Sequence, residues 1–158
     1  PGCRPLTVGA GFRVAVEQGW AIININAGSG TLHPELAKLS KEAWEKGLIV
    51  IAAKDNRPDV IGYPAALGNV LAVDMEHFED PLALRFDPTA EVEVEANGIY
   101  VDAPLAGGGR KFFTGSSFAA PHVAAIAARL KECNPALNPE TFREILAILN
   151  HPAPARDH

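Results

Sequence analysis

Short runs of apolar residues, each close to a segment with helical periodicity, limit this chain to few fold classes. Residues 48–53 are apolar throughout, and residues 69–74 carry a second run in which only the two ends are polar. Strands that are buried on both faces have this pattern, and they belong to parallel sheets covered by helices on both sides. We therefore predict an α/β fold with a mostly parallel central sheet, right-handed crossovers and helices on both faces, giving three layers.

Four segments predict the helices that cover this sheet. Apolar residues at helical spacing predict a helix over residues 8–18, ended by Gly19 in a left-handed cap. Residues 34–46 begin with proline and an acidic residue, which are typical of a first helical turn. Residues 118–131 are small and apolar and predict a central helix that its neighbours approach closely, and residues 139–149 follow an asparagine cap.

Three further strands complete the expected sheet. Residues 21–26 form a short β-branched run that stops at a glycine-rich loop. Residues 91–95 alternate strictly between acidic and apolar side chains, so we expect an edge strand with one wet face. Residues 99–102 predict another short strand, followed by a loop at the three glycines 107–109.

Composition excludes several partners. The 14 Lys and Arg against 19 Asp and Glu give a net charge of −5 with no basic cluster, so no nucleic-acid partner is expected. No apolar run approaches the ~20 residues of a membrane helix, so no membrane partner is expected. The 2 cysteines have no metal-ligand spacing and are expected to be free or to form a single bridge.

Ser117 stands between a glycine-containing loop and the helix predicted at 118–131. The N-terminus of a helix offers unpaired N–H donors and the positive end of the helix dipole, which can stabilise an oxyanion beside a serine hydroxyl. A serine at this position also serves as an ordinary helix cap. The placement alone leaves both roles open.

The longer string around Ser117 resembles the nucleophile motif of the subtilisin-like serine proteases. Residues 115–124 read G-S-S-F-A-A-P-H-V-A, against G-[TS]-S-x-A-x-P-[HV]-V-[AS] in the family. Four other stretches resemble family segments in the expected order: 22–28 the I-N-M-S-L-G strand, 50–53 the strand before the oxyanion asparagine, 61–74 V-G-Y-P-G…V-I-A-V-G, and 101–104 the D-V-x-A-P-G turn. The resemblance covers about residues 8–150 and implies a site at the carboxyl ends of parallel strands.

The resemblance also assigns roles position by position. Ser117 would be the nucleophile that attacks a peptide carbonyl, and its backbone N–H would be one oxyanion donor. The strip that pairs with an extended substrate would consist of Asn26, Ala27 and Gly28. The pocket for the residue before the scissile bond would have a wall formed by Ala52, Ala53 and Lys54, with Gly62 at its base. By themselves the two glycines are typical of ordinary turns.

The loop after residue 53 departs from the family pattern. The family reads A-A-G-N, and its asparagine side chain donates to the oxyanion, whereas this chain reads Ala52-Ala53-Lys54-Asp55-Asn56. A gapless alignment puts Asp55 at the asparagine position, where an ionised carboxylate has no N–H to donate. A shift of one residue in the loop would bring Asn56 there instead. We expect Asp55 at this position, with Asn56 as the alternative.

The aspartate and histidine of a catalytic triad have no counterpart in these residues. In the order of the family both precede the serine, yet the N-terminal side contains neither D-[ST]-G nor H-G-T. His33 and His77 stand in other contexts and are expected on the surface, and His122 fits the structural His-Val step of the family. The rival G-x-S-x-G elbow of α/β-hydrolases lacks its second glycine, and only a short proline-broken tail follows with candidate partners.

We therefore expect a partial catalytic domain over residues 1–158, with a tail at 151–158, that acts as a serine endopeptidase on polypeptide substrates. A second chain or another portion of the protein would supply the aspartate and histidine, and part of the apolar surface would face it. By itself the chain is expected to be inactive and loosely packed. The alternative is a pseudoprotease or peptide-binding module. The family often binds structural calcium, but no acidic loop has its ligand spacing, so no metal or cofactor is assigned.

Overall fold

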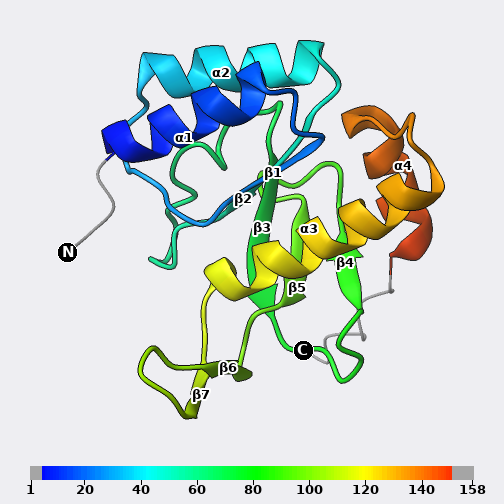
Figure 1. Ribbon diagram of the computed structural model, residues 1–158. Coiled ribbons are helices and arrows are strands. Elements are labelled where there is room, and N and C mark those ends of the chain that lie inside the picture. Colours follow the sequence, from blue (N-terminus) through cyan, green and yellow to red (C-terminus); the bar gives the residue numbers. More distant parts are fainter. Residues whose placement is uncertain (1–4, 151–158) are drawn as a thin grey trace.

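The computed structural model describes residues 5–150, with side chains from residue 8 onward (Figure 1). The predicted tail at 151–158 and Cys3 lie outside these residues. In chain order the elements are α1 (Pro5–Glu17), β1 (Ile22–Ile25), α2 (Pro34–Glu45), β2 (Ile49–Ala53), β3 (Leu71–Glu76), β4 (Leu84–Phe86), β5 (Val94–Asn97), β6 (Val101–Pro104), β7 (Arg110–Phe113), α3 (Ser116–Cys133) and α4 (Pro139–Leu149).

A five-stranded sheet in the order β1-β2-β3-β5-β4 forms the centre of the molecule. Strands β1, β2, β3 and β5 are parallel, and β4 runs antiparallel to β5 at one edge. Ile49, Val50 and Ile51 of β2 are each at most 2% exposed. The prediction of an α/β fold with strands buried on both faces is therefore confirmed.

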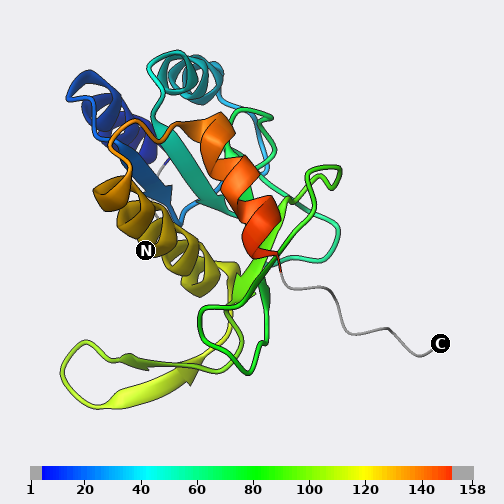
Figure 2. The same cartoon turned by 90° about the vertical axis from the view of Figure 1, so that its right-hand side faces the viewer.

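Helices cover both faces of the sheet (Figures 1 and 2). On one face, Phe12 of α1 and Leu36 of α2 pack with Val50 of β2. On the other face, Val123 of α3 and Phe142 of α4 pack with Ile51, the next residue of β2. Apolar side chains of β3, β4 and β5 belong to the same cluster. Because side chains alternate along a strand, the uninterrupted apolar sequence supplies both cores at once.

The expectation of an edge strand at residues 91–95 is wrong. β5 is hydrogen-bonded on both sides, to β3 and to β4, and the short strand β4 forms the edge. Of the three alternating acids, Glu91 is exposed, whereas Glu93 and Glu95 are partly buried and paired with arginines. Glu95 forms an ion pair with Arg85 of β4, and Glu93 forms one with Arg143 of α4 at 2.7 Å. With only three residues, β4 is too short to show a periodicity.

An antiparallel hairpin of β6 and β7 projects from the body of the domain (Figure 2). The strand predicted at 99–102 is present as β6, and its partner β7 is an element that the sequence did not indicate. Residues 101–104, which resemble a family turn, are therefore a strand of this hairpin. The three glycines at its tip all have positive φ angles, between +82° and +105°. Among the described helices, none is long and apolar enough to cross a membrane.

Gly98 fixes the distance between the sheet and the start of α3. Its carbonyl oxygen accepts a hydrogen bond from the N–H of Gly115 at 2.8 Å. A methyl group at Gly98 would lie 2.7 Å from the Cβ of Met75 and 2.8 Å from the carbonyl oxygen of Gly115. Such close approaches leave room only for glycine, so this residue sets where the serine loop lies.

We predict that Gly98→Ala lowers the free energy of unfolding by roughly 1–3 kcal/mol, because the added methyl overpacks the contact between β5 and the serine loop. Urea unfolding followed by circular dichroism measures the change. Gly68→Ala is the matched control, since a methyl group there has no neighbour within 4 Å. Equal stability of the two variants would contradict the prediction.

Candidate active site

Ser117 is held at the N-terminus of the buried helix α3. The helix begins at Ser116, and Gly115 precedes it in an extended conformation. As the second residue of the helix, Ser117 has a backbone N–H with no partner within the helix. Its neighbour Ser116 is 1% exposed, whereas Ser117 is partly open to solvent. The Ser117 hydroxyl thus stands beside the N–H of its own residue, whereas the N–H groups of Ser116 and Phe118 are bonded to Asn56 and to the Gly115 carbonyl oxygen.

The Asn56 side chain joins the loop after β2 to this helix start. Its Oδ1 accepts hydrogen bonds from the backbone N–H of Ser116 at 2.9 Å and from the Ser116 hydroxyl at 3.0 Å. The Ser116 hydroxyl also contacts the Lys54 carbonyl oxygen. Because the backbone N–H must meet an oxygen, the orientation of the amide is fixed and Nδ2 keeps its hydrogens for another acceptor.

The Asn56 amide and the Ser117 hydroxyl lie on the same side of Gly115. A Cβ atom built at Gly115 would lie 3.3 Å from the Nδ2 of Asn56 and 3.4 Å from the Oγ of Ser117. The absence of a side chain at Gly115 therefore keeps open the space between a nucleophile and an amide donor. The hydroxyl can attack a carbonyl carbon, and the amide can donate a hydrogen bond to the oxygen anion that forms.

Asp55 is directed elsewhere. Its Oδ1 accepts from the backbone N–H of Arg57 at 2.9 Å and from Nε at 3.0 Å, and its Oδ2 accepts from Nη2 at 2.7 Å. These hydrogen bonds lower the pKa of Asp55 to about 2, so the carboxylate is ionised. Its Cβ lies 3.4 Å from the point where Gly62 would carry its own, which places the side chain over the predicted pocket base.

A cavity of about 360 Å³ brings most of the predicted residues together. It is lined by Asn26, Gly28, Ala53, Lys54, Asp55, Asn56, Arg57, Ser116 and Ser117. Three predicted residues do not line it: Ala27, which lines a different groove, Ala52, which is 0% exposed in the core, and Gly62, which lies behind Asp55. Arg57 and Ser116 were not singled out from the sequence. Arg57 could have been found from the sequence, because an arginine two residues after Asp55 is close enough to pair with its carboxylate.

The loop after β1 closes one side of this cavity. Ser29 and Tyr63 exchange two backbone hydrogen bonds, at 3.0 and 2.8 Å. A methyl group at Gly28 would come within 3.3 Å of the Tyr63 carbonyl oxygen. The close approach of two backbones, together with the positive φ of +75° at Gly62, explains the glycines that the sequence left ambiguous.

Within residues 5–150, no histidine lines the Ser117 cavity. His122 accompanies the nucleophile on α3, and its Nδ1 contacts the Asn97 carbonyl oxygen at 2.8 Å. His33 caps the start of α2 without a side-chain cap bond, and the N–H of His77 meets its neighbour Glu76. Over the same residues, no group of three or more His, Cys, Asp and Glu is arranged to hold a metal ion.

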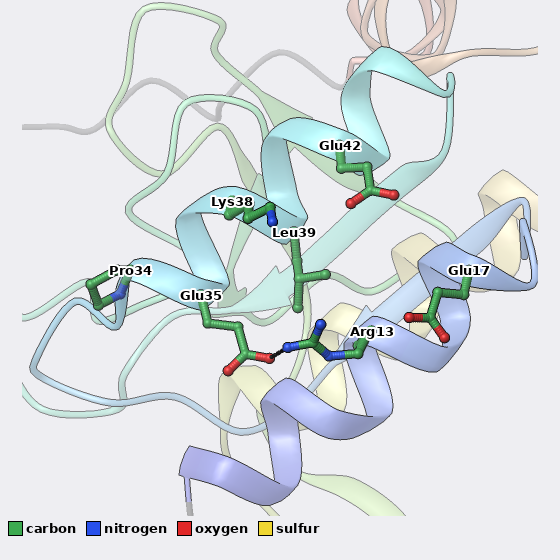
Figure 3. A pocket seen from close by; sticks show the side chains of 7 residues that line it. All are labelled: Arg13, Glu17, Pro34, Glu35, Lys38, Leu39 and Glu42. Atoms are coloured by element: carbon green, nitrogen blue, oxygen red, sulfur yellow. Dashed lines mark hydrogen bonds and ion pairs between the residues drawn. The ribbon is translucent and has the colours of Figure 1, made fainter.

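A second hollow of about 320 Å³ lies between α1 and α2 (Figure 3). Arg13 on α1 forms an ion pair with Glu35 on α2 across it. Glu42 on its rim bonds to Lys46, which lowers the pKa of Glu42. This hollow belongs to the face of the sheet opposite α3, and no serine, threonine or cysteine lines it. It joins two helices and is separate from the Ser117 cavity.

We predict that Arg57→Gln returns the pKa of Asp55 from about 2 toward its ordinary value of 3.8, because the guanidinium hydrogen bonds are lost. The native pKa lies below the ordinary one, so the pair stabilises the fold above about pH 4 and loses this contribution as the pH falls toward 2. Carbon-13 NMR titration of the carboxyl group measures the shift. Asp87, whose pKa is lowered by Thr89, is the internal control. An unchanged Asp55 titration would contradict the pairing.

The chain is similar to bacterial proteases over most of its length. It is 30% identical over 129 residues to alkaline elastase YaB from Bacillus sp. (strain YaB), which covers 81% of this chain and 34% of the relative. It is 29% identical over 143 residues to subtilisin DY from Bacillus licheniformis, covering 87% of this chain and 52% of the relative. The chain thus spans between about a third and a half of these two relatives.

Solved structures give the same result. The prenylagaramide maturation protease PagA superposes with a TM-score of 0.79 at 25% identity, covering 97% of this chain and 60% of that one. Sphericase superposes with a TM-score of 0.72 at 26% identity, covering 89% and 53%. The sequence matches the model of the subtilase family over residues 1–153. Ser117 lies at the start of a buried helix beside a parallel sheet. The chain therefore belongs to the subtilase family and corresponds to a C-terminal portion of a subtilase.

Proposed function

We propose that this chain is the nucleophile half of a serine endopeptidase domain whose aspartate and histidine come from outside these 158 residues. The observation that carries the proposal is the Ser117 hydroxyl beside the free amide of Asn56, in a cavity at the carboxyl ends of β1 and β2. The similarity to alkaline elastase YaB and subtilisin DY, which are named as proteases, also supports the proposal.

In the proposed reaction, Ser117 Oγ attacks a peptide carbonyl while its proton passes to the histidine supplied from outside. The carbonyl oxygen becomes an anion and accepts hydrogen bonds from the N–H of Ser117 and from Nδ2 of Asn56. The C–N bond then breaks, the proton leaves with the amine, and an acyl-enzyme remains on Ser117. Water, deprotonated by the same histidine, hydrolyses the ester and restores the hydroxyl.

The geometry favours Asn56 over Asp55 as the oxyanion residue. The Asn56 amide lies against Gly115 and Ser116, next to Ser117, with its NH₂ group free. The Asp55 carboxylate is ionised, bound by Arg57 and turned toward Gly62. An ionised carboxylate repels a developing oxyanion, so Asp55 in this state opposes the chemistry.

The exposed edge of the sheet at β1 supports the proposal that the portion with the aspartate and histidine docks beside Ser117. β1 is the terminal strand, and an apolar groove of about 430 Å³ runs along it, lined by residues of α1, of β1 and of the segments on either side of β1, which include Phe12, Ile23 and Trp20. Trp20 is 57% exposed. Asn26 lines both this groove and the Ser117 cavity, so a portion bound at the edge would reach the nucleophile.

The alternative function is a pseudoprotease or binding module that holds an extended peptide at Asn26, Ala27 and Gly28 without cleaving it. The observation that favours it is the absence, within residues 5–150, of any histidine lining the Ser117 cavity. Mass spectrometry of the purified protein separates the two functions. A polypeptide or flanking segment with D-[ST]-G and H-G-T motifs supports the endopeptidase.

We predict that a fluorophosphonate labels Ser117 in protein that contains the aspartate and histidine portion, because the histidine activates the hydroxyl. Ser117→Ala should abolish labelling, as measured by intact-mass spectrometry. Ser29→Ala, which removes a partly exposed hydroxyl from the neighbouring loop, should leave labelling unchanged. Absence of labelling while that portion is present would favour the binding module.

We predict that Asn56→Asp lowers kcat by about 10²–10³-fold with KM nearly unchanged, which is the loss that removal of one oxyanion donor causes in a subtilisin. The substitution keeps an oxygen for the N–H of Ser116, removes the NH₂ donor and adds a carboxylate charge that repels the oxyanion, so the loss is at least that of one donor. Asp55→Asn should change kcat for a neutral substrate less than about tenfold. A large rise in kcat for Asp55→Asn with no loss for Asn56→Asp would assign the oxyanion to position 55.

A further inference from the structure

The loop after β2 gives the Ser117 cavity three charged residues. Lys54, Asp55 and Arg57 all line it, so its wall carries two cations and one anion. The sequence identified this segment as a departure from the family pattern and put Lys54 in the wall of the substrate pocket. Which of these charges stays available to a ligand depends on the pairs that they form.

Each of the three charged groups already forms an ion pair. The Lys54 ammonium lies 3.1 Å from the Asp74 carboxylate, and its side chain is 18% exposed. Both oxygens of Asp55 are bonded to Arg57, so this carboxylate is neutralised by a cation within the cavity. A positively charged ligand therefore meets no free anion among the lining residues.

Arg57 retains hydrogen-bonding capacity. Its guanidinium uses Nε and Nη2 for Asp55, while both hydrogens of Nη1 and the second hydrogen of Nη2 remain. The side chain is 64% exposed. Nη2 lies 3.4 Å from the point where Gly30 would carry a Cβ, so the guanidinium spans from the β2 loop to the loop after β1. It therefore lies at the cavity between these two loops.

The free polar groups of the cavity are thus mainly donors: the outer edge of Arg57, the Asn56 amide and the Ser117 hydroxyl. A carboxylate is the side chain that matches a guanidinium in both charge and planar geometry. A lysine or arginine side chain would instead lie next to the guanidinium and be repelled. A neutral amide would accept hydrogen bonds without the charge.

We infer that the cavity selects an acidic residue, Asp or Glu, immediately before the scissile bond, with Arg57 as the specificity-determining residue. This inference rests on the proposed function, because it takes the Ser117 cavity as the place where that residue binds. Asp55 positions the guanidinium by holding Nε and Nη2, and the remaining nitrogen binds the substrate carboxylate.

Peptide binding tests the inference without requiring turnover. Three blocked peptides that differ only in a final Glu, Gln or Lys are titrated into the Ser117→Ala protein, together with the aspartate and histidine portion, and followed by NMR. The Glu peptide should bind about tenfold more tightly than the Gln peptide, as expected for a partly exposed charged hydrogen bond. The Lys peptide should bind most weakly, and the Glu preference should fall as salt is added.

Substitutions at Arg57 assign the preference to this residue. In Arg57→Gln the advantage of Glu over Gln should disappear, and the uncovered Asp55 carboxylate should make Lys the preferred residue. Arg57→Lys keeps the charge without the planar fork and should retain part of the Glu preference. Arg110→Gln is the matched control, because Arg110 is 61% exposed, pairs with Asp102 and does not line the cavity.

The outcomes separate this inference from the proposed function. Equal binding of Glu and Gln peptides to the parent protein, or a Glu preference that survives Arg57→Gln, overturns the inference and leaves the endopeptidase proposal standing. If none of the three peptides binds at millimolar concentration, the cavity is not a substrate site, and both fail.

Discussion

The hydrogen bonds between Asn56 and Ser116 connect the two parts of the chain on which the site depends. The loop after β2 and the first turn of α3 are 60 residues apart in sequence, and the Oδ1 of Asn56 meets both the N–H and the hydroxyl of Ser116. One of the unpaired donors of the helix start is thereby used for attachment. The N–H of Ser117 is left for chemistry, and the amide of Asn56 is left pointing its NH₂ group toward the same space.

The packing of α3 makes this connection rigid. Ala119, Ala120, Val123 and Ala127 are each 0% exposed, and they lie against β2, β3 and β5. Small side chains let the helix approach the sheet closely, and Gly98 leaves room for the serine loop where the sheet ends. The nucleophile is therefore positioned by the core of the domain and not by a mobile loop.

Charge pairing explains where the sequence patterns misled. Alternating acids at 91–95 are typical of a wet face, yet Glu93 and Glu95 are held by Arg143 and Arg85, which come from distant elements. Asp55 is likewise held by a cation, Arg57, and a gapless alignment compares residue types without showing which side chains pair. In both regions the residue type was correctly read, but its electrostatic partner became visible only in three dimensions.

The sequence alone determined the α/β class, the parallel strands and the family, because apolar runs, helix starts and the string around Ser117 are local patterns. It also named most of the residues that line the cavity. The tertiary structure decided that Asn56 and not Asp55 lies beside the hydroxyl, that Asp55 faces Gly62, and that Arg57 reaches from the loop after β2 toward Gly30. These depend on side-chain contacts between segments that follow different strands, and a linear pattern contains no distance between such segments.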